Sequence, residues 1–349
     1  MKKILFIVED LYGGGAEKVL LNTASLLQGA GAHIIVYTLR DNVEHSIPDN
    51  IKPINIAIVN RLTKSISNLF IEKIQAFFLH RKILRESPDV IISCSCDKIT
   101  RHLPSNLNIY YWIHGNVTGF AEKNEKSYAK FKRFYNGRNL ICVSHGIADD
   151  ILKNVKATPK SCKVIYNPFD VAKIQAMANE DIKVPFEKYF IHIGSFEERK
   201  RHDRLLQAYK LSDIDTPLVL MGKGPLRQNI EVLIKELDLT SKVIIIDFQK
   251  NPYPYIKFAQ ALVLTSDAEG LPTVLIEALI CHTQVISVDC PSGPSEILTG
   301  ELQKYLCPMN DVQMLAKFLV SADKKTIDID HNVYQIFSSE ETIKHFMML

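Results

Sequence analysis

The amino-acid sequence predicts an α/β protein built from two doubly wound parallel sheets. Short apolar runs alternate along the chain with longer segments of helical period, which is typical of parallel βα units. The alternation occurs in two series, separated by KVIYNPFD at 163–170. The 349 residues also exceed what one hydrophobic core usually supports. We therefore expect one domain over 1–167, a second over 168–332, and a C-terminal helix at 333–349 that packs back on the first.

The first series supplies the elements of the first domain. Its predicted strands are ILFIV (4–8), HIIVYT (33–38), DVIIS (89–93), IYYWI (109–113) and LICVS (140–144). Its predicted helices lie at 17–28, 65–86, 122–135 and 145–153. Strands that alternate with helices in this way form a sheet that is covered on both faces.

The second series has the same organisation. Its predicted strands are YFIHIG (189–194), PLVLMG (217–222), KVIII (242–246), ALVLT (261–265) and QVISVD (284–289). Its predicted helices lie at 203–211, 226–238, 252–260, 272–281 and 294–299. In open α/β sheets, ligands bind at the carboxyl ends of the strands. Two such Rossmann-like domains that face one another across a cleft would place the chemistry in strand-to-helix loops.

Composition and charge narrow the class of protein. The amino-terminal apolar run ends at Glu9 and Asp10, too early for a signal peptide, and no apolar stretch is long enough to span a bilayer. We therefore expect a cytoplasmic protein. Residues 1–167 carry 23 Lys+Arg against 14 Asp+Glu, hence +9, whereas the remainder carries 19 against 25, hence −6. The first half is therefore the one expected to meet an anionic partner.

A glycine-rich turn follows the first predicted strand, in LYGGGAEKVLLN at 11–22. Gly14 and Gly15 allow a close backbone approach and precede a helix, which suits a phosphate or a phosphorylated sugar. A dinucleotide fingerprint would have a third glycine where Lys18 stands, so NAD binding is disfavoured. A surface turn without a ligand is the other interpretation of this segment.

Two glutamates flank a Gly-Leu-Pro turn in SDAEGLPTVLIEAL, at 266–279. Pro272 suits the first helical turn, and Thr273 continues the helix. The N–H groups of Gly270 and Leu271 then lie at a helix amino terminus, which favours a diphosphate. The carboxylates at positions 269 and 277 can accept hydrogen bonds from sugar hydroxyls. Taken singly, either glutamate is as well explained as a solvated surface residue.

At this point the sequence resembles a known family. EGLPTVLIE is similar to the E-x7-E motif of retaining glycosyltransferases of family 4, which have the GT-B fold. Other segments resemble that family in the same order: GGGAEKVLLN (13–22), SHGIADDI (144–151), VIYNPFD (164–170), IGSFEERKRHDRLLQA (193–208), MGKGPLR (221–227), NPYPYIKFAQALVLTSDAEGLPTVLIEAL (251–279) and DCPSGPSEIL (289–298). The resemblance covers nearly the whole chain.

The resemblance implies roles for particular residues. Glu269 would contact the donor sugar, Glu277 the ribose, and Lys200 the leaving diphosphate. The family often has an arginine after the strand glycine Gly194, but Ser195 stands there in this sequence. Whether Arg199 or Arg201 supplies that charge is left open. Three more positions match the family's donor or cleft residues: His114 beside the donor sugar, Gly222 in the next turn, and Phe248 near the base.

The activity implied by the resemblance is sugar transfer with retention from a nucleoside diphosphate sugar, a UDP-sugar being favoured. The expected acceptor is lipopolysaccharide or a lipid-linked oligosaccharide. Neither a cofactor nor a metal is expected, because electrostatic stabilisation of the diphosphate suffices. Two Asp-x-Asp spacings, at 213–215 and 328–330, lie outside the expected cleft. The alternatives are an epimerase of the same fold, a soluble transferase with a small acceptor, and a non-catalytic nucleotide-sugar sensor, which the intact set of Glu269, Lys200 and Glu277 disfavours. A nucleic-acid partner is not expected.

Two basic segments of the first half raise the question of membrane contact. In 122–138, Tyr128, Phe131, Phe134 and Tyr135 fall on one helical face among lysines and arginines. That face suits either peripheral contact with an anionic inner membrane or packing on the first sheet, and both interpretations stay open. For 62–85, packing in the core is the favoured interpretation.

Overall fold

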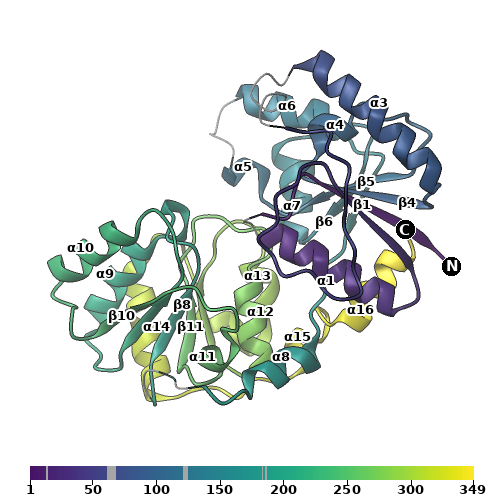
Figure 1. The fold of residues 1–349 in the computed structure, drawn as a ribbon. Coiled ribbons are helices and arrows are strands. Elements are labelled where there is room, and N and C mark those ends of the chain that lie inside the picture. Colours follow the sequence, from purple (N-terminus) through teal and green to yellow (C-terminus); the bar gives the residue numbers. More distant parts are fainter. Residues whose placement is uncertain (13–14, 61–67, 121–124, 183, 185–186) are drawn as a thin grey trace. The chain divides into compact units, whose positions relative to one another are not determined.

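The computed structural model describes residues 1–12, 15–60, 68–120, 125–182, 184 and 187–349 (Figure 1). Contacts divide the chain into two compact units. Unit 1 comprises Met1–Pro168 together with Ser339–Leu349, and unit 2 comprises Phe169–Ser338. The sequence had placed the first boundary at residue 167 and the second at residue 332.

Unit 1 is organised around a parallel sheet of seven described strands in the order β3-β2-β1-β4-β5-β6-β7. The strands are β1 (Lys3–Val8), β2 (His33–Thr38), β3 (Ile54–Asn55), β4 (Val90–Cys94), β5 (Ile109–Ile113), β6 (Asn139–Cys142) and β7 (Ser161–Val164). The five predicted strands are all present. The sequence missed β3 and β7, because β3 has only two exposed residues and the SCKV of β7 lacks an apolar run.

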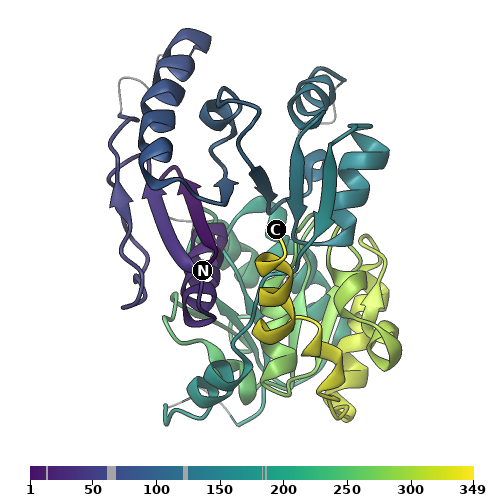
Figure 2. The ribbon, with the colours of Figure 1, turned by 90° about the vertical axis from the view of Figure 1, so that its right-hand side faces the viewer.

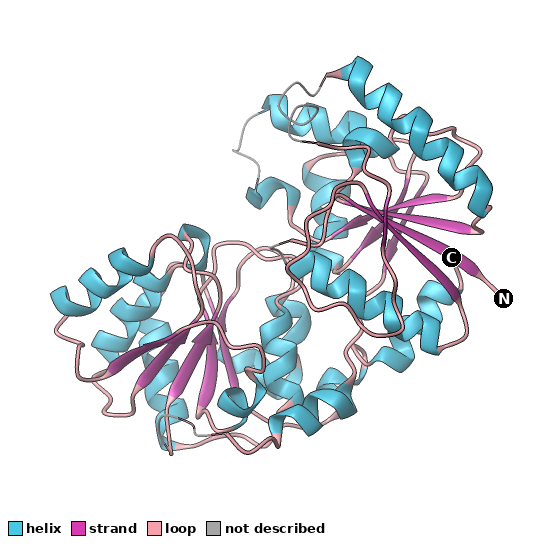
Figure 3. Cartoon of the chain, in the orientation of Figure 1, coloured by secondary structure: helices cyan, strands magenta, loops and turns pink. Residues whose placement is uncertain are grey.

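Helices cover both faces of this sheet (Figure 3). They are α1 (Gly15–Gly29), α3 (Leu69–Glu86), α4 (Asp97–Thr100), α5 (Val117–Phe120), α6 (Glu125–Tyr135), α7 (His145–Asp149), the π-helix η1 (Asp150–Asn154) and α16 (Ser339–Met347). The helix α16 packs beside α1. The N-cap of α3 is Asn68, whose side chain accepts hydrogen bonds from the backbone N–H groups of Phe70 and Ile71. The expected start of this helix at 65 lies outside the described residues.

Unit 2 contains a second parallel sheet, with six described strands in the order β10-β9-β8-β11-β12-β13. These are β8 (Phe190–Ile193), β9 (Leu218–Met221), β10 (Val243–Ile246), β11 (Ala261–Leu264), β12 (Val285–Val288) and β13 (Leu306–Cys307). The predicted α/β class with two doubly wound sheets is therefore correct. The strand β13 has two residues, too few for the sequence pattern to reveal.

The helices of unit 2 again lie on both faces of its sheet (Figure 3). They are α8 (Val171–Ala178), η2 (Glu198–Lys200), α9 (His202–Ser212), α10 (Arg227–Glu236), α11 (Tyr253–Lys257), α12 (Thr273–Ile280), α13 (Pro294–Ile297), η3 (Gly300–Tyr305), α14 (Val312–Lys324) and α15 (Asn332–Gln335). The sequence had not predicted α8 or α14. An N-cap aspartate begins each of them, Asp170 for α8 and Asp311 for α14.

The two basic segments behave differently in the structure. In α6, Phe134 makes an edge contact with Tyr111 of β5 at 5.6 Å between ring centroids, and Tyr135 is buried. The aromatic face of α6 thus packs on the sheet. In α3, by contrast, several large apolar side chains are exposed, among them Phe70 and Phe77. The favoured interpretation of 62–85 as a core helix therefore fails on that face of α3. Residues 61–67 and 121–124 are not among those described.

Within the described ranges, no helix combines the length and the apolarity that crossing a bilayer requires.

Candidate active site

The loops that follow β8 and β11 are adjacent, because the two strands are neighbours in the sheet of unit 2. Both loops leave the carboxyl edge of that sheet, where α/β proteins bind ligands. The backbone N–H of Asp267 donates to the carbonyl of Arg199 at 2.8 Å. The Thr265 hydroxyl donates to the Lys200 carbonyl at 3.0 Å. These bonds hold the two loops together.

An ion pair connects the loops at the predicted site. Lys200 Nζ donates to Glu269 Oε1 at 2.6 Å, and both side chains are nearly buried, with exposed fractions of 11% and 10%. Arg199 Nη1 lies 3.6 Å from the other carboxylate oxygen of Glu269. Two cations therefore converge on the Glu269 carboxylate where the loops after β8 and β11 meet. Such an arrangement concentrates positive charge in a place with little competing water.

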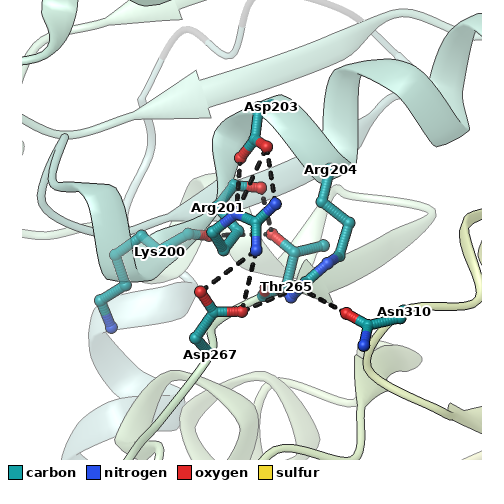
Figure 4. A network of polar contacts seen from close by, with 7 residues as sticks. All are labelled: Lys200, Arg201, Asp203, Arg204, Thr265, Asp267 and Asn310. Carbon is teal, nitrogen blue, oxygen red and sulfur yellow. Dashed lines mark hydrogen bonds and ion pairs between the residues drawn. The ribbon is translucent and has the colours of Figure 1, made fainter. Parts of the chain in front are cut away.

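A second ionic cluster lies beside the first (Figure 4). Arg201 bonds both Asp203 and Asp267, with Nη1–Oδ1 of Asp267 at 3.2 Å. Arg204, only 3% exposed, donates to the carbonyl of Thr265 and to Asp267 Oδ1, each at 2.7 Å. Figure 4 also shows the amine of Lys200 pointing away from this cluster.

The two clusters differ in which arginine could supply the charge of the family arginine, whose position is occupied by Ser195 here. Arg199 lies beside Glu269, whereas Arg201 is engaged by Asp203 and Asp267. Arg199 also contacts Glu197 at 3.2 Å, and its side chain is 36% exposed. Arg199 is therefore the arginine that lies against the same carboxylate as Lys200.

Two of the predicted glycines pack against each other. A Cβ on Gly194 would lie 3.6 Å from Lys200 Cδ, so the strand end and the lysine are in contact. Gly222 has φ +157°, and a Cβ there would lie 1.9 Å from the Gly194 carbonyl oxygen. No side chain fits at Gly222, because the turn after β9 packs on the turn after β8. Gly222 is thus placed to shape the loop that holds Lys200.

The predicted turn at 270–273 begins α12. Thr273 is the first residue of the helix and Pro272 its N-cap, while Gly270 and Leu271 are buried just before it. Gly293 supports this turn with φ +100°, since a Cβ there would lie 2.3 Å from Pro272 Cδ. Sequence reasoning did not single out Gly293, although it lies in the DCPSGPSEIL segment.

Glu277 lies one turn inside α12 and is half-buried. The hydroxyl of Tyr253, on α11, donates to Glu277 Oε1 at 3.2 Å. Burial, together with the nearby Glu277 charge, raises the pKa of Tyr253 well above its usual value, so the phenol stays protonated as a donor. Tyr253 orients the carboxylate and was also missed, because a tyrosine in NPYPY is equally typical of a buried helix start.

Phe248, predicted to lie near the base, is 59% exposed in the segment between β10 and α11. Lys223 Nζ lies 5.4 Å from the centroid of its ring. An exposed aromatic face next to a cation suits stacking of a planar ring.

The predicted residues of unit 1 that the structure describes lie after β5 and at the start of α1. His114 follows β5, is half-buried, and lies against Trp112, with ring centroids 4.4 Å apart and the rings tilted by 50°. Burial lowers the pKa of His114 to about 3, so its imidazole is neutral at neutral pH. Gly15 begins α1 and is exposed, with open space where a Cβ would lie. Gly14 lies outside the described residues.

Two family models match this chain. The model described as "Glycosyl transferases group 1" matches residues 176–325, and the model described as "Glycosyltransferase Family 4" matches residues 13–173. The chain is a glycosyltransferase with a Family 4 domain followed by a group 1 domain. The first match contains Lys200, Glu269 and Glu277, and the second contains His114. The fold is GT-B, and each of the two matched ranges contains one Rossmann-like domain.

Two relatives of this glycosyltransferase are named for diphospho-undecaprenol and lipopolysaccharide. The chain is 27% identical over 317 residues to the N-acetylgalactosamine-N,N'-diacetylbacillosaminyl-diphospho-undecaprenol 4-alpha-N-acetylgalactosaminyltransferase of Campylobacter jejuni, covering 85% of this chain and 83% of that one. It is 24% identical to the lipopolysaccharide 1,6-galactosyltransferase of Escherichia coli K12, covering 94% and 91%. The crystal structure of Anabaena Alr3699/HepE in complex with UDP-glucose shares the fold, with a TM-score of 0.74, 18% identity and coverage of 100% and 99%.

Proposed function

We propose that this glycosyltransferase moves a sugar from a UDP-sugar to a hydroxyl of a lipopolysaccharide or lipid-linked oligosaccharide, with retention at the anomeric carbon and without a metal ion. The observation that carries the proposal is the Lys200–Glu269 pair, 2.6 Å apart and flanked by Arg199. The pair lies where the loops after β8 and β11 meet, at the carboxyl edge of the sheet in unit 2.

The cluster suits a donor whose sugar and diphosphate are recognised together. Lys200 and Arg199 supply positive charge for the diphosphate, and the helix amino terminus at Gly270–Thr273 adds partial positive charge. The Glu269 carboxylate can accept hydrogen bonds from sugar hydroxyls once Lys200 turns toward phosphate. Glu277, oriented by Tyr253, would accept from the ribose hydroxyls.

The proposed chemistry is a displacement on one face of the sugar. The acceptor oxygen bonds to the anomeric carbon as the bond from that carbon to the diphosphate oxygen breaks. The acceptor proton passes to the departing diphosphate oxygen, so atoms and charge balance. The protein then acts mainly by orienting the donor and neutralising the developing charge on the diphosphate, chiefly through Lys200. We assign neutral His114 a hydrogen-bonding role toward the donor sugar and not that of a cation.

The proposed acceptor and the proposed nucleotide are inferred from the names of relatives and of a structural neighbour. The Campylobacter enzyme is named for a diphospho-undecaprenol acceptor, and the Escherichia coli enzyme for lipopolysaccharide. The Anabaena neighbour was solved with UDP-glucose, which favours UDP. With such an acceptor, we propose that the reaction takes place at the cytoplasmic face of the inner membrane. Any contact of 122–138 with that membrane would be electrostatic, because the described aromatic side chains of α6 pack on the sheet while Lys130 and Lys132 are exposed.

The test is a transfer assay in which donor, acceptor and metal are varied independently. UDP-glucose, UDP-galactose and their N-acetyl counterparts are each incubated with truncated lipopolysaccharide or with polyprenyl-diphosphate oligosaccharide, with and without EDTA. The proposal predicts a product with one added sugar in the donor's anomeric configuration, formed equally in EDTA and lost in Lys200→Ala. An inverted product or a requirement for metal would refute the mechanism.

The same assay distinguishes the two alternatives. An epimerase would convert the UDP-sugar without any acceptor, and a transferase with a small acceptor would label soluble sugars or hydroxy acids but not the lipid-linked glycans. Either result would replace the proposed acceptor.

A further inference from the structure

The helix α3 turns an apolar surface to solvent. Its outward side chains are Leu69, Phe70, Ile74, Phe77, Phe78 and Leu84, with exposed fractions from 41% at Ile74 to 72% at Phe70. Positions 70, 74, 77, 81 and 84 recur every three or four residues and so lie on one side of the helix. The helix lies at the periphery of unit 1 in both views (Figures 1 and 2). A contiguous apolar face of this kind usually marks an interaction surface.

Polar side chains on the opposite side fix the orientation of α3. Glu72 is only 6% exposed and is ion-paired with Arg101 and with His102 Nε2, the latter at 3.2 Å. Gln75 is also buried and donates to the carbonyl of Ile58 at 3.0 Å. Rotating the helix to bury its phenylalanines would expose or break these buried polar contacts. The exposure of the apolar side is therefore built into the packing.

The outward side also carries positive charge. Lys73, Arg81, Lys82 and Arg85 are exposed on the described helix. The two acidic residues of α3 do not offset them, because Glu72 is buried and Glu86 pairs with Lys3. The partner that complements this mixture of apolar and cationic side chains is apolar inside and anionic at its surface.

We propose that this surface, the α3 docking face (Leu69, Phe70, Lys73, Ile74, Phe77, Phe78, Arg81, Leu84 and Arg85), binds an anionic phospholipid bilayer. The phenylalanines and leucines would enter the headgroup boundary while the cations meet lipid phosphates. A second copy of the chain is a poorer occupant, because two such faces would bring like charges together. The inference does not depend on which donor the enzyme uses.

The experiment is co-sedimentation of the full chain with vesicles of phosphatidylcholine that contain about 30% phosphatidylglycerol, compared with pure phosphatidylcholine. One variant removes apolar contact, Phe70→Ser with Phe77→Ser. Another removes charge only, Lys73→Gln with Arg81→Gln and Arg85→Gln. The matched control, Leu211→Ser with Val232→Ser, removes two apolar side chains that are 61% and 53% exposed on unit 2. The Tm of each variant and its shift with UDP report whether fold and donor site persist.

We expect the parent chain and the control to bind the anionic vesicles, and each α3 variant to bind at least about tenfold more weakly with an unchanged Tm. The charge variant keeps every apolar side chain, so it remains decisive if the phenylalanine variant unfolds. A parent chain that stays in the supernatant, or α3 variants that sediment like it, would overturn the proposal. Self-association without lipid that Phe70→Ser with Phe77→Ser abolishes would assign the face to a second copy instead.

Discussion

Two ionic clusters occupy neighbouring positions on the same pair of loops, yet they are built differently. In the first, Lys200 and Arg199 converge on Glu269, and Arg199 is 36% exposed. In the second, Arg201 and Arg204 are tied to Asp267, and Arg204 also donates to a backbone carbonyl. The first joins side chains of the two loops, whereas the second also bonds the backbone of the loop that carries Glu269.

The difference indicates that neighbouring basic residues of the loop after β8 have different roles. In the proposed mechanism, Lys200 exchanges the Glu269 carboxylate for a donor phosphate without opening the fold. Arg204 cannot leave its place, because Asp267 and the Thr265 carbonyl would lose a buried partner. We therefore expect the basic residues of EERKRHDR to differ in role, with Lys200 acting in donor binding and Arg204 in stability. Substitutions should distinguish these two roles.

The largest expected effect is on catalysis, from Lys200→Ala. We expect kcat/KM to fall by about 10²- to 10³-fold, because the leaving diphosphate loses its closest cation. Stability without ligand should fall less than in Arg204→Ala, since Arg199 still faces Glu269. Steady-state kinetics and urea unfolding measure the two quantities, with exposed Lys210→Ala as the control. Full activity in Lys200→Ala would contradict the proposed role of Lys200 and with it the difference between the two clusters.

The next effect is on stability, from Arg204→Ala. We expect the free energy of unfolding to fall by about 2–4 kcal/mol, since the buried Thr265 carbonyl loses its donor and Asp267 loses one of its two arginine partners. Arg204→Lys should recover part of that loss. Denaturant unfolding provides the measurement. An Arg204→Ala variant as stable as the parent but inactive would show that Arg204 serves the ligand.

A smaller effect should follow from Tyr253→Phe. The variant keeps the ring and loses the hydrogen bond to Glu277. We expect KM for the donor to rise about 3- to 10-fold with kcat nearly unchanged, in line with one hydrogen bond of modest net worth. A fall in kcat at constant KM would contradict a role through Glu277 and would indicate that Tyr253 acts on the reacting atoms.

The smallest effect concerns pH and Asp203. Burial raises the pKa of this carboxyl, but hydrogen bonds from Arg201 outweigh it and leave the pKa below its usual 3.8. A lowered pKa in the folded state gives stability above pH 3.8 that is lost as pH falls through the folded value. Asp203→Asn should therefore have a lower Tm than the parent at pH 7, with the difference closing below pH 3.8. A difference independent of pH would contradict the assignment.

Much of this architecture follows from sequence, and the exceptions have physical causes. The strand periodicity was enough to predict both sheets. The resemblance of EERKRH and EGLPTVLIE to a known family indicated Lys200, Glu269 and Glu277 as donor-site candidates. The choice between Arg199 and Arg201 was not predictable, because it depends on Asp267, on a different loop. Helical periodicity likewise cannot say which side of α3 faces the sheet. Buried Glu72 decides it, against the usual preference for apolar burial.

The most direct test of the central claim is calorimetric titration of UDP into the parent chain, Lys200→Ala and the control Lys210→Ala. If Lys200 and Glu269 form the donor diphosphate site, UDP binds the parent and the control alike, and at least about tenfold more weakly to Lys200→Ala. Equal affinity in all three proteins, or no binding of UDP, GDP, ADP or CDP to the parent, would contradict the account.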